Sequence, residues 1–181
     1  MQDIQQLKYP AGKLTIPAEI SEAQIKEYIA TIAEFPQRVA TEIKDLAEDE
    51  LSSCHYRPEG WNIKQVLNHC IDSHMNSFIR FKLALTEENP TIRPYDETAW
   101  AELPDTLMYG VSESILLLQS VHKRWVFLLN SITAEKFTRT FVHPDGNELV
   151  SLKENLCIYA WHCENHFLHI ANAKKFKFPK D

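Results

Sequence analysis

The chain of 181 residues is 44% hydrophobic and 24% charged, as in an ordinary globular domain, and its net charge is −6. The acidic balance argues against a nucleic-acid or anionic-membrane partner, and no apolar run approaches the length that crosses a bilayer. We therefore expect one domain over residues 1–181, located in the cytoplasm because the first residues lack an apolar signal core. The four cysteines form no C-x-x-C pair and are expected to stay reduced.

The first 18 residues predict an irregular arm, because Pro10 and Pro17 interrupt them. Ser21-Glu-Ala-Gln24 has the spacing of a capping box and predicts the start of a helix. Apolar residues then recur at helical spacing, and Pro36 is expected to kink or split this first helix.

A second helix is predicted from Asn62, whose side chain can cap it, to about Glu87. At about 100° per residue, one stripe of this helix is apolar. Four polar residues line up along one flank of that stripe: His69, Ser73, Asn76 and Arg80. This polar flank beside the predicted core is an organised feature in its own right.

The rest of the chain predicts an ordered loop, two more helices and a hairpin. The loop, Glu88–Asp105, contains three prolines, and a strongly periodic helix covers Val111–Ile132. Two short strands at 138–142 and 148–150 flank a Pro-Asp-Gly-Asn turn, and a capping box at Ser151 starts a helix that ends near Lys174 or Lys175. The fold class is therefore all-α: an up-down four-helix bundle with a small β-hairpin and an ordered loop insertion.

Three histidines lie within eight residues of the last predicted helix. His162, His166 and His169 are spaced by four and three residues, so they project into one sector beside the apolar stripe. A lone histidine in such a place is more often a surface or core-edge residue. An i, i+4 pair, however, can place two ring nitrogens on one metal ion, and spacing alone leaves these alternatives evenly weighted.

A third metal ligand has to come from another part of the chain. The candidates are His69, His74, His122 and His143. His74 falls in the middle of its apolar stripe and is better explained as a hydrogen-bonded core residue, whereas His69 lies on the polar flank and is preferred. Three imidazoles leave a coordination position open, as in catalytic zinc sites.

Two familiar metal motifs are absent. His162-Cys-Glu-Asn-His166 resembles the zinc-protease motif H-E-x-x-H, but Glu164 is one place late and should point away from the metal. Paired Glu-x-x-His motifs, which carboxylate di-iron bundles require, are also missing. Cys163 is expected to pack in the core, and Asp72 has either a solvated role or a role beside the ligands.

Five segments together resemble the YfiT-like group of the DinB superfamily, and they span most of the chain. These are Gly60-Trp61, His69-Cys-Ile-Asp-Ser-His-Met-Asn76, Arg80-Phe-Lys-Leu-Ala-Leu-Thr86, Asn89-Pro-Thr-Ile-Arg-Pro-Tyr-Asp96 and Tyr159-Ala-Trp-His162. The resemblance implies a four-helix bundle that holds one divalent metal with three histidines. Carried over by position, the ligands are His69, His162 and His166, and His169 becomes a neighbour of the site.

The resemblance also implies a function. Members of the family have been named as metal-dependent hydrolases, and related members transfer bacillithiol or similar low-molecular-weight thiols. We expect a metal-dependent enzyme that activates water or a thiol, with zinc or nickel as the metal, a thiol as the possible co-substrate, a small molecule as the substrate and a homodimer as the assembly. The absence of a placed carboxylate base favours thiol transfer. The alternative is a non-catalytic metal-binding or ligand-binding stress-response protein, and the acidic charge argues against a DNA-repair role.

The sequence assigns no catalytic acid or base. Six residues are predicted to border the substrate: Asn76, Arg80, Arg93, Tyr95, Asp96 and His169. Arg80 and the 93–96 loop are expected to bind an anionic group. An ion pair between Arg80 and a carboxylate of the loop is an equally weighted alternative.

Overall fold

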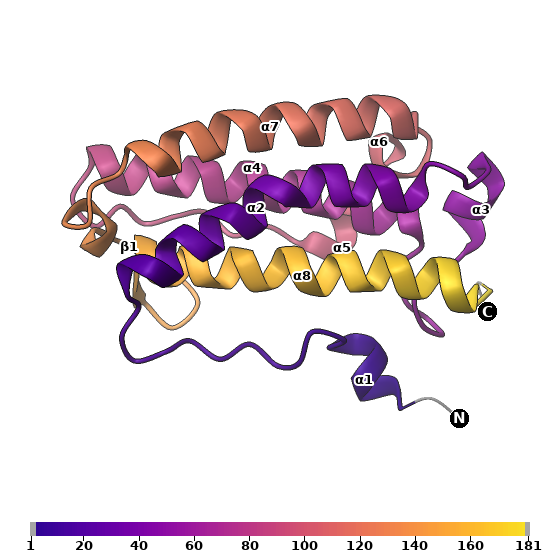
Figure 1. The fold of residues 1–181 in the computed structure, drawn as a ribbon, viewed down its shortest axis with the longest axis horizontal. Helices are drawn as coiled ribbons and strands as arrows, with labels where there is room; N and C mark the ends of the chain where they lie inside the picture. The colour runs from indigo at the N-terminus through magenta and orange to yellow at the C-terminus, as the bar shows by residue number, and fades with distance from the viewer. Residues whose placement is uncertain (1–2, 180–181) are drawn as a thin grey trace.

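The computed structural model describes residues 3–179, so the first two residues of the predicted arm lie outside the described part. Four long helices form a bundle (Figure 1): α2 (Glu22–Ile43), α4 (Ile63–Thr86), α7 (Val111–Ser131) and α8 (Leu152–Phe176). The predicted all-α four-helix bundle with a hairpin is confirmed. The shorter elements are α1 (Ile4–Lys8), α3 (Glu48–Ser53), α5 (Glu97–Trp100), α6 (Pro104–Leu107), η1 (Lys136–Thr138), β1 (Thr140–His143) and β2 (Glu148–Ser151).

The predicted helix starts are confirmed by their caps. Ser21, Asn62 and Ser151 each accept a hydrogen bond from the backbone N–H three residues later, and the glutamine or glutamate at that position bonds back to the cap. Pro36 does not split α2, which is one continuous helix of 22 residues. Figure 1 shows α2 changing direction midway, as expected where a proline removes one helical hydrogen bond.

The order of the helices departs from simple alternation. Among the four long helices α2 and α4 follow one another in the chain, but each packs mainly against α8 and α7. Ser114 of α7 bonds Asn68 of α4 at 2.8 Å, and His122 of α7 bonds His74 of α4 at 2.7 Å, so both helices advance in the same direction. The segment between them, residues 87–110, therefore returns the chain along the whole bundle (Figure 1).

The predicted loop insertion is ordered and contains two helical turns, α5 and α6. Gln65 donates to the Ala101 carbonyl at 3.1 Å, and Asn68 donates to the Thr106 carbonyl at 3.2 Å. At its other end, Thr91 forms a parallel bridge with Val142 of β1. The loop is thereby fixed against α4 at one end and against the hairpin at the other.

The hairpin pairs β1 with β2 in antiparallel register, from Thr140 opposite Ser151 to His143 opposite Glu148. Its turn places Gly146 at φ +89° and Asn147 at φ +53°, a backbone region that favours these two residue types. β2 ends at Ser151, the residue that caps α8. The hairpin therefore sets the starting point of the helix that carries the histidine cluster.

The N-terminal arm is more regular than predicted. Residues 4–8 form α1, because Asp3 caps this helical turn through the Gln5 N–H. The following stretch lies along α8 (Figure 1), where Trp161 donates its indole N–H to the Gly12 carbonyl at 2.9 Å. The prolines thus limit the helix to one short turn, and α8 fixes the rest of the arm.

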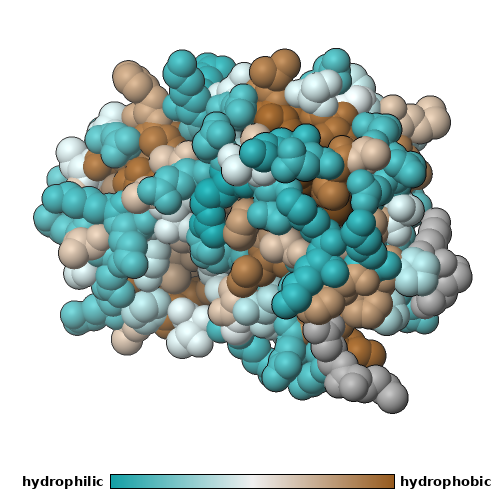
Figure 2. Space-filling model, turned by 45° about the vertical axis from the view of Figure 1, so that its right-hand side comes forward, coloured by the Kyte–Doolittle hydropathy of each residue, from teal (hydrophilic) through white to brown (hydrophobic). Residues whose placement is uncertain are grey.

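The core lies between the four helices. Its largest fully buried side chains include Trp125, Phe35 and Phe81. Hydrophilic residues dominate the face shown in Figure 2, with smaller hydrophobic groups between them. Within residues 3–179, no helix combines the length and the apolar character needed to span a membrane.

Candidate metal centre

The structure brings together the three histidines expected as metal ligands. His69 comes from the first half of α4, and His162 and His166 come from the middle of α8, which runs antiparallel to α4 (Figure 1). One nitrogen from each ring lies within 4.8 Å of the others. The Nε2 atoms of His69 and His162 are 3.2 Å apart. The polar flanks of the two helices therefore meet at one point.

This spacing fits a shared metal ion. Imidazole nitrogens bind at about 2.0–2.1 Å from zinc-type ions, so two of them on one ion lie roughly 2.8–3.4 Å apart at octahedral or tetrahedral angles. The 3.2 Å between the Nε2 atoms of His69 and His162 falls in that interval. The donor set consists only of imidazoles, which suits borderline divalent ions such as zinc and nickel.

The three rings are neutral at physiological pH. Burial, together with nearby His169, lowers the pKa of His69 to about 4. Burial and the neighbouring histidines likewise lower the pKa of His162 and that of His166 well below the ordinary value. A metal would meet free lone pairs, because no proton has to leave these rings first.

The remaining histidines separate into different environments. His74 is fully buried and bonds both His122 and His162, which agrees with its predicted role as a hydrogen-bonded core residue. His143 lies on β1, with its Nδ1 atom 3.8 Å from a carboxylate oxygen of Asp145. His169 is buried next to His166, their Nδ1 atoms being 3.2 Å apart, and is not among the residues that could share an ion.

A second group of possible ligands was not anticipated from the sequence. Cys70, His74 and His162 also place ligand atoms within 4.8 Å of one another. The sequence did contain a pattern that indicates it, because Cys70 and His74 are four residues apart and share one face of α4. Burial, however, raises the pKa of the Cys70 thiol well above its ordinary value and so disfavours the thiolate that binds metal.

Glu164 points away from the histidines, as predicted. Its carboxylate forms an ion pair with Arg38 of α2, and both side chains are about one-third exposed. Asp72, for which two roles remained open, is partly buried, and burial together with Asp105 raises its pKa to about 6. Neither carboxylate belongs to a group of side chains that could hold a metal within the described residues.

We expect Glu164→Gln to keep the full metal content of the protein. The substitution removes a partly exposed ion pair with Arg38, so the free energy of unfolding should fall by no more than about 1 kcal/mol. Elemental analysis and chemical denaturation measure the two quantities. A loss of metal in this variant would contradict the orientation of Glu164 and restore the protease-like alternative.

Four of the six predicted substrate residues, Asn76, Arg93, Tyr95 and Asp96, line a cavity farther along α4, whereas Arg80 and His169 do not. Asn76 is seven residues after His69, so it lies roughly 10 Å along the same face of the helix. The cavity has a volume of about 590 Å³. Its lining residues are Asn76, Arg93, Pro94, Tyr95, Asp96 and Trp100.

The charged and polar side chains around this cavity differ in whether they have hydrogen-bond or ion-pair partners. Asp96 caps α5 through the Ala99 N–H at 2.9 Å, and the Tyr95 hydroxyl is buried without a hydrogen-bond partner among the described residues. Arg80 does not line the cavity, and residues 3–179 contain no carboxylate within ion-pair distance of it. The expected alternative, an ion pair of Arg80 with the loop, is therefore not formed. Burial raises the pKa of Glu97, and the charge of Arg80 partly offsets this rise.

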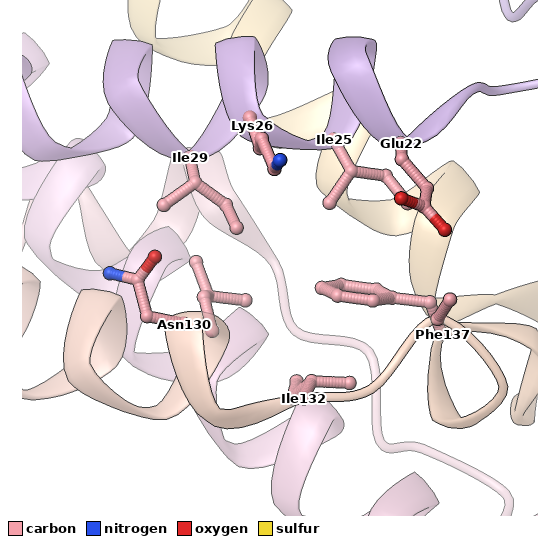
Figure 3. Close-up of a pocket in the computed structure, with 9 residues that line it drawn as sticks. Glu22, Ile25, Lys26, Ile29, Asn130, Ile132 and Phe137 are labelled. Carbon is pink, nitrogen blue, oxygen red and sulfur yellow. The ribbon is translucent and has the colours of Figure 1, made fainter.

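A second cavity, of about 220 Å³, lies between α2, α7 and the segment that follows α7. Figure 3 shows Ile25 and Ile29 of α2 facing Phe137 and Ile132 across it. None of the predicted metal or substrate residues lines this cavity. The described part of its mostly apolar lining contains no histidine or cysteine, so the histidine cluster remains the better candidate for chemistry.

Comparison with known proteins identifies the family of this chain. Residues 23–170 match the family model described as the DinB superfamily. A relative from Bacillus cereus strain AH820 is 47% identical over 169 residues, covering 93% of this chain and 96% of its own. A relative from Bacillus thuringiensis subsp. konkukian strain 97-27 is 46% identical with the same coverage. Both carry the name "Putative metal-dependent hydrolase".

A solved structure has the same fold over nearly the whole chain. It is that of YfiT from Bacillus subtilis, described as "a probable metal-dependent hydrolase with an unusual four-helix bundle topology". The two chains superpose with a TM-score of 0.90 at 42% identity, covering 94% of this chain and 97% of the other. The parallel placement of α4 and α7 described above is one departure from the usual up-and-down order.

Proposed function

The chain is a YfiT-like member of the DinB superfamily, and on this premise we propose that it is a divalent-metal-dependent enzyme acting on a small molecule. The observation that carries the proposal is the convergence of three neutral imidazoles, those of His69, His162 and His166. The names of the relatives point to the same class of chemistry.

The protein's part in this chemistry is to hold the metal and leave room beside it. His69, His162 and His166 would supply three of its ligands, which leaves at least one position for a water or a substrate atom. When bound, a divalent cation lowers the pKa of a water or thiol in that position towards neutrality. His162 and His166 are partly exposed and His69 is buried, so the site lies at the edge of the core.

Two reactions fit this arrangement, hydrolysis and thiol transfer. The names of the relatives support hydrolysis. Glu164, the acidic residue between the two ligands on α8, is paired with Arg38 and is not placed to serve as a general base. A thiol bound as its thiolate would need no such base, which favours thiol transfer.

The cavity along α4 supplies a place for the substrate. Its residue Asn76 lies roughly 10 Å from His69 along the same helix face. Arg93 is a charged group in its lining that no described ion pair engages. The buried Tyr95 hydroxyl gives a second unsatisfied polar group. We therefore propose a substrate with an anionic or strongly polar group that bonds Arg93, with its reacting atom near the histidines.

Turnover by the metal-loaded protein tests the proposal and separates its branches. Chlorodinitrobenzene with bacillithiol, glutathione or cysteine reports thiol transfer, because the new C–S bond forms as chloride leaves. A panel of carboxylic and phosphoric esters and amides reports hydrolysis. If the protein binds metal but accelerates neither set of reactions, the enzyme proposal is wrong and the non-catalytic alternative replaces it.

We also propose that the protein forms a homodimer through the outer face of α7. Leu116 and Phe127 are 62% and 80% exposed, and a separation of 11 residues places them on one face of the helix. Met108 and Tyr109, just before α7, are also exposed. Light scattering should give twice the 21.0 kDa mass of one chain, and Phe127→Glu should lower it towards one. A wild-type mass of one chain would contradict the dimer.

A further inference from the structure

His162 is the first member of a chain of hydrogen-bonded histidines. Its Nδ1 atom lies 3.0 Å from Nε2 of His74. The Nδ1 atom of His74 lies 2.7 Å from Nε2 of His122. The Nδ1 atom of His122 lies 2.7 Å from the backbone oxygen of Ile32. The chain thus runs from α8 through α4 and α7 to α2, and it crosses the whole bundle.

The last hydrogen bond in this series of histidines, to the Ile32 carbonyl, fixes which nitrogen of each ring carries the proton. A carbonyl oxygen only accepts hydrogen bonds, so His122 must carry its proton on Nδ1. Its Nε2 atom then accepts, and His74 must donate from Nδ1. The Nε2 atom of His74 accepts in turn, and His162 must donate from Nδ1. The Nε2 atom of His162 is left with a free lone pair, and this atom faces His69.

His166 has a shorter chain of the same kind. Its Nδ1 atom lies 3.2 Å from Nδ1 of His169, and the Nε2 atom of His169 lies 3.0 Å from the backbone oxygen of Lys8. The Lys8 carbonyl makes Nε2 of His169 the donor, so Nδ1 of His169 accepts the proton of His166 Nδ1. The Nε2 atom of His166 is also left with a free lone pair.

The surroundings permit only one proton on each ring. His74 and His122 are fully or almost fully buried, and they pack against the rings of Phe35 and Trp125. His169 is stacked on Tyr56, with 3.9 Å between the ring centroids. A ring buried among apolar and aromatic side chains takes a second proton only at a high cost in free energy, so each of these rings carries a single proton.

We propose that His74, His122 and His169 are positioning residues that hold His162 and His166 in the Nδ1–H tautomer, with Nε2 presented to the metal. The inference rests on the proposed metal function of His162 and His166. Metal-binding histidines generally donate their second N–H to an acceptor, which sets the tautomer and the ring orientation. Here the acceptors are further histidines. Each series of hydrogen bonds ends on a backbone carbonyl, which can only accept, so the donors and acceptors along the series cannot exchange roles.

The same geometry opposes a metal at Cys70, His74 and His162. Nε2 of His74 and Nδ1 of His162 are joined by the 3.0 Å hydrogen bond, so an ion held through these two atoms would have to displace the proton that they share. A proton and a metal ion cannot both occupy that position. The chain of histidines therefore selects the first group of ligands, His69, His162 and His166, over the second.

The tautomers can be measured without any metal. In the metal-free wild-type protein, long-range ¹H–¹⁵N NMR correlations should show protons on Nδ1 of His162, His74, His122 and His166. In His74→Phe, which removes the acceptor, His162 should shift towards the Nε2–H form. An Nε2–H tautomer for His162 in the wild-type protein would overturn the proposal, even if no variant folds.

Metal affinity gives the second readout, by competition with a chelator. His74→Phe, His122→Phe and His169→Phe should each weaken binding about 10- to 100-fold. His74→Gln should recover much of this loss, because its amide oxygen can accept from His162. His55→Phe is the control, since His55 is equally buried but bonds the Gly60 carbonyl outside the cluster.

Equal affinities in His74→Phe and the wild type, or equal losses in His74→Phe and His55→Phe, would overturn the positioning role. If the wild-type protein binds no metal at all, the proposed function fails instead. The tautomers of the metal-free protein would still be decided by NMR, so the two failures are distinguishable.

Discussion

Replacing both His162 and His166 with alanine is expected to abolish metal binding and leave the helical fold in place. The double variant removes two of the three imidazoles that converge within 4.8 Å, and His69 alone cannot hold a divalent ion against water. Both side chains are partly exposed, so their loss opens no large internal cavity. Elemental analysis should find less than about one-tenth of the wild-type metal content, a loss larger than any single positioning variant should cause.

The control for this experiment is His143→Ala. His143 lies on the hairpin and outside both groups of potential ligands, so its loss should change neither metal content nor helicity. Circular dichroism of the double variant should match that of the metal-free wild type. An unchanged metal content in the double variant would show that the assignment of His162 and His166 as ligands is wrong.

The helices and the histidine face could be predicted because both depend on local spacing. Ser21, Asn62 and Ser151 are caps that any chain would use in the same way, and they mark the helix starts without tertiary information. The i, i+4 spacing of His162 and His166 is local in the same sense. The polar flank of α4 then identified His69, and the structure brings it to the other two.

The partners of His74 could not be predicted, because they depend on which helices adjoin. The bond from His74 to His122 requires α4 and α7 to run side by side in one direction, and this depends on the path of residues 87–110. Short connections would have predicted antiparallel neighbours instead. The Lys8 carbonyl that ends the second chain was missed for a similar reason, since α1 is too short to have a strong sequence signal.

The metal-free protein is expected to lose most of its stability between about pH 6.5 and pH 4. Burial lowers the pKa of His69 and that of His122 to about 4, whereas an unfolded histidine titrates near 6.5. Above pH 6.5 both states are neutral and the two groups have no effect. As the pH falls, the unfolded state takes up protons that the folded state does not, so the free energy of unfolding decreases until about pH 4.

The size of this effect follows from the two pKa values. A difference of about 2.5 units corresponds to about 3 kcal/mol for each histidine, or about 6 kcal/mol for the pair. That is comparable with the whole stability of a typical domain, about 5–15 kcal/mol. Four further histidines, His74, His162, His166 and His169, have lowered pKa values and act in the same direction.

Two carboxyl groups, those of Asp72 and Glu97, oppose this trend. Burial raises the pKa of Asp72 to about 6 and also raises that of Glu97, so each binds a proton first in the folded state and adds some stability as the pH falls. Six histidines should outweigh these two groups. Denaturant unfolding at pH 8, 7, 6 and 5 measures the slope, and His122→Phe should reduce that slope by at most about 1.4 kcal/mol per pH unit. A free energy of unfolding that is constant from pH 7 to pH 5 would contradict the lowered pKa values of the buried histidines.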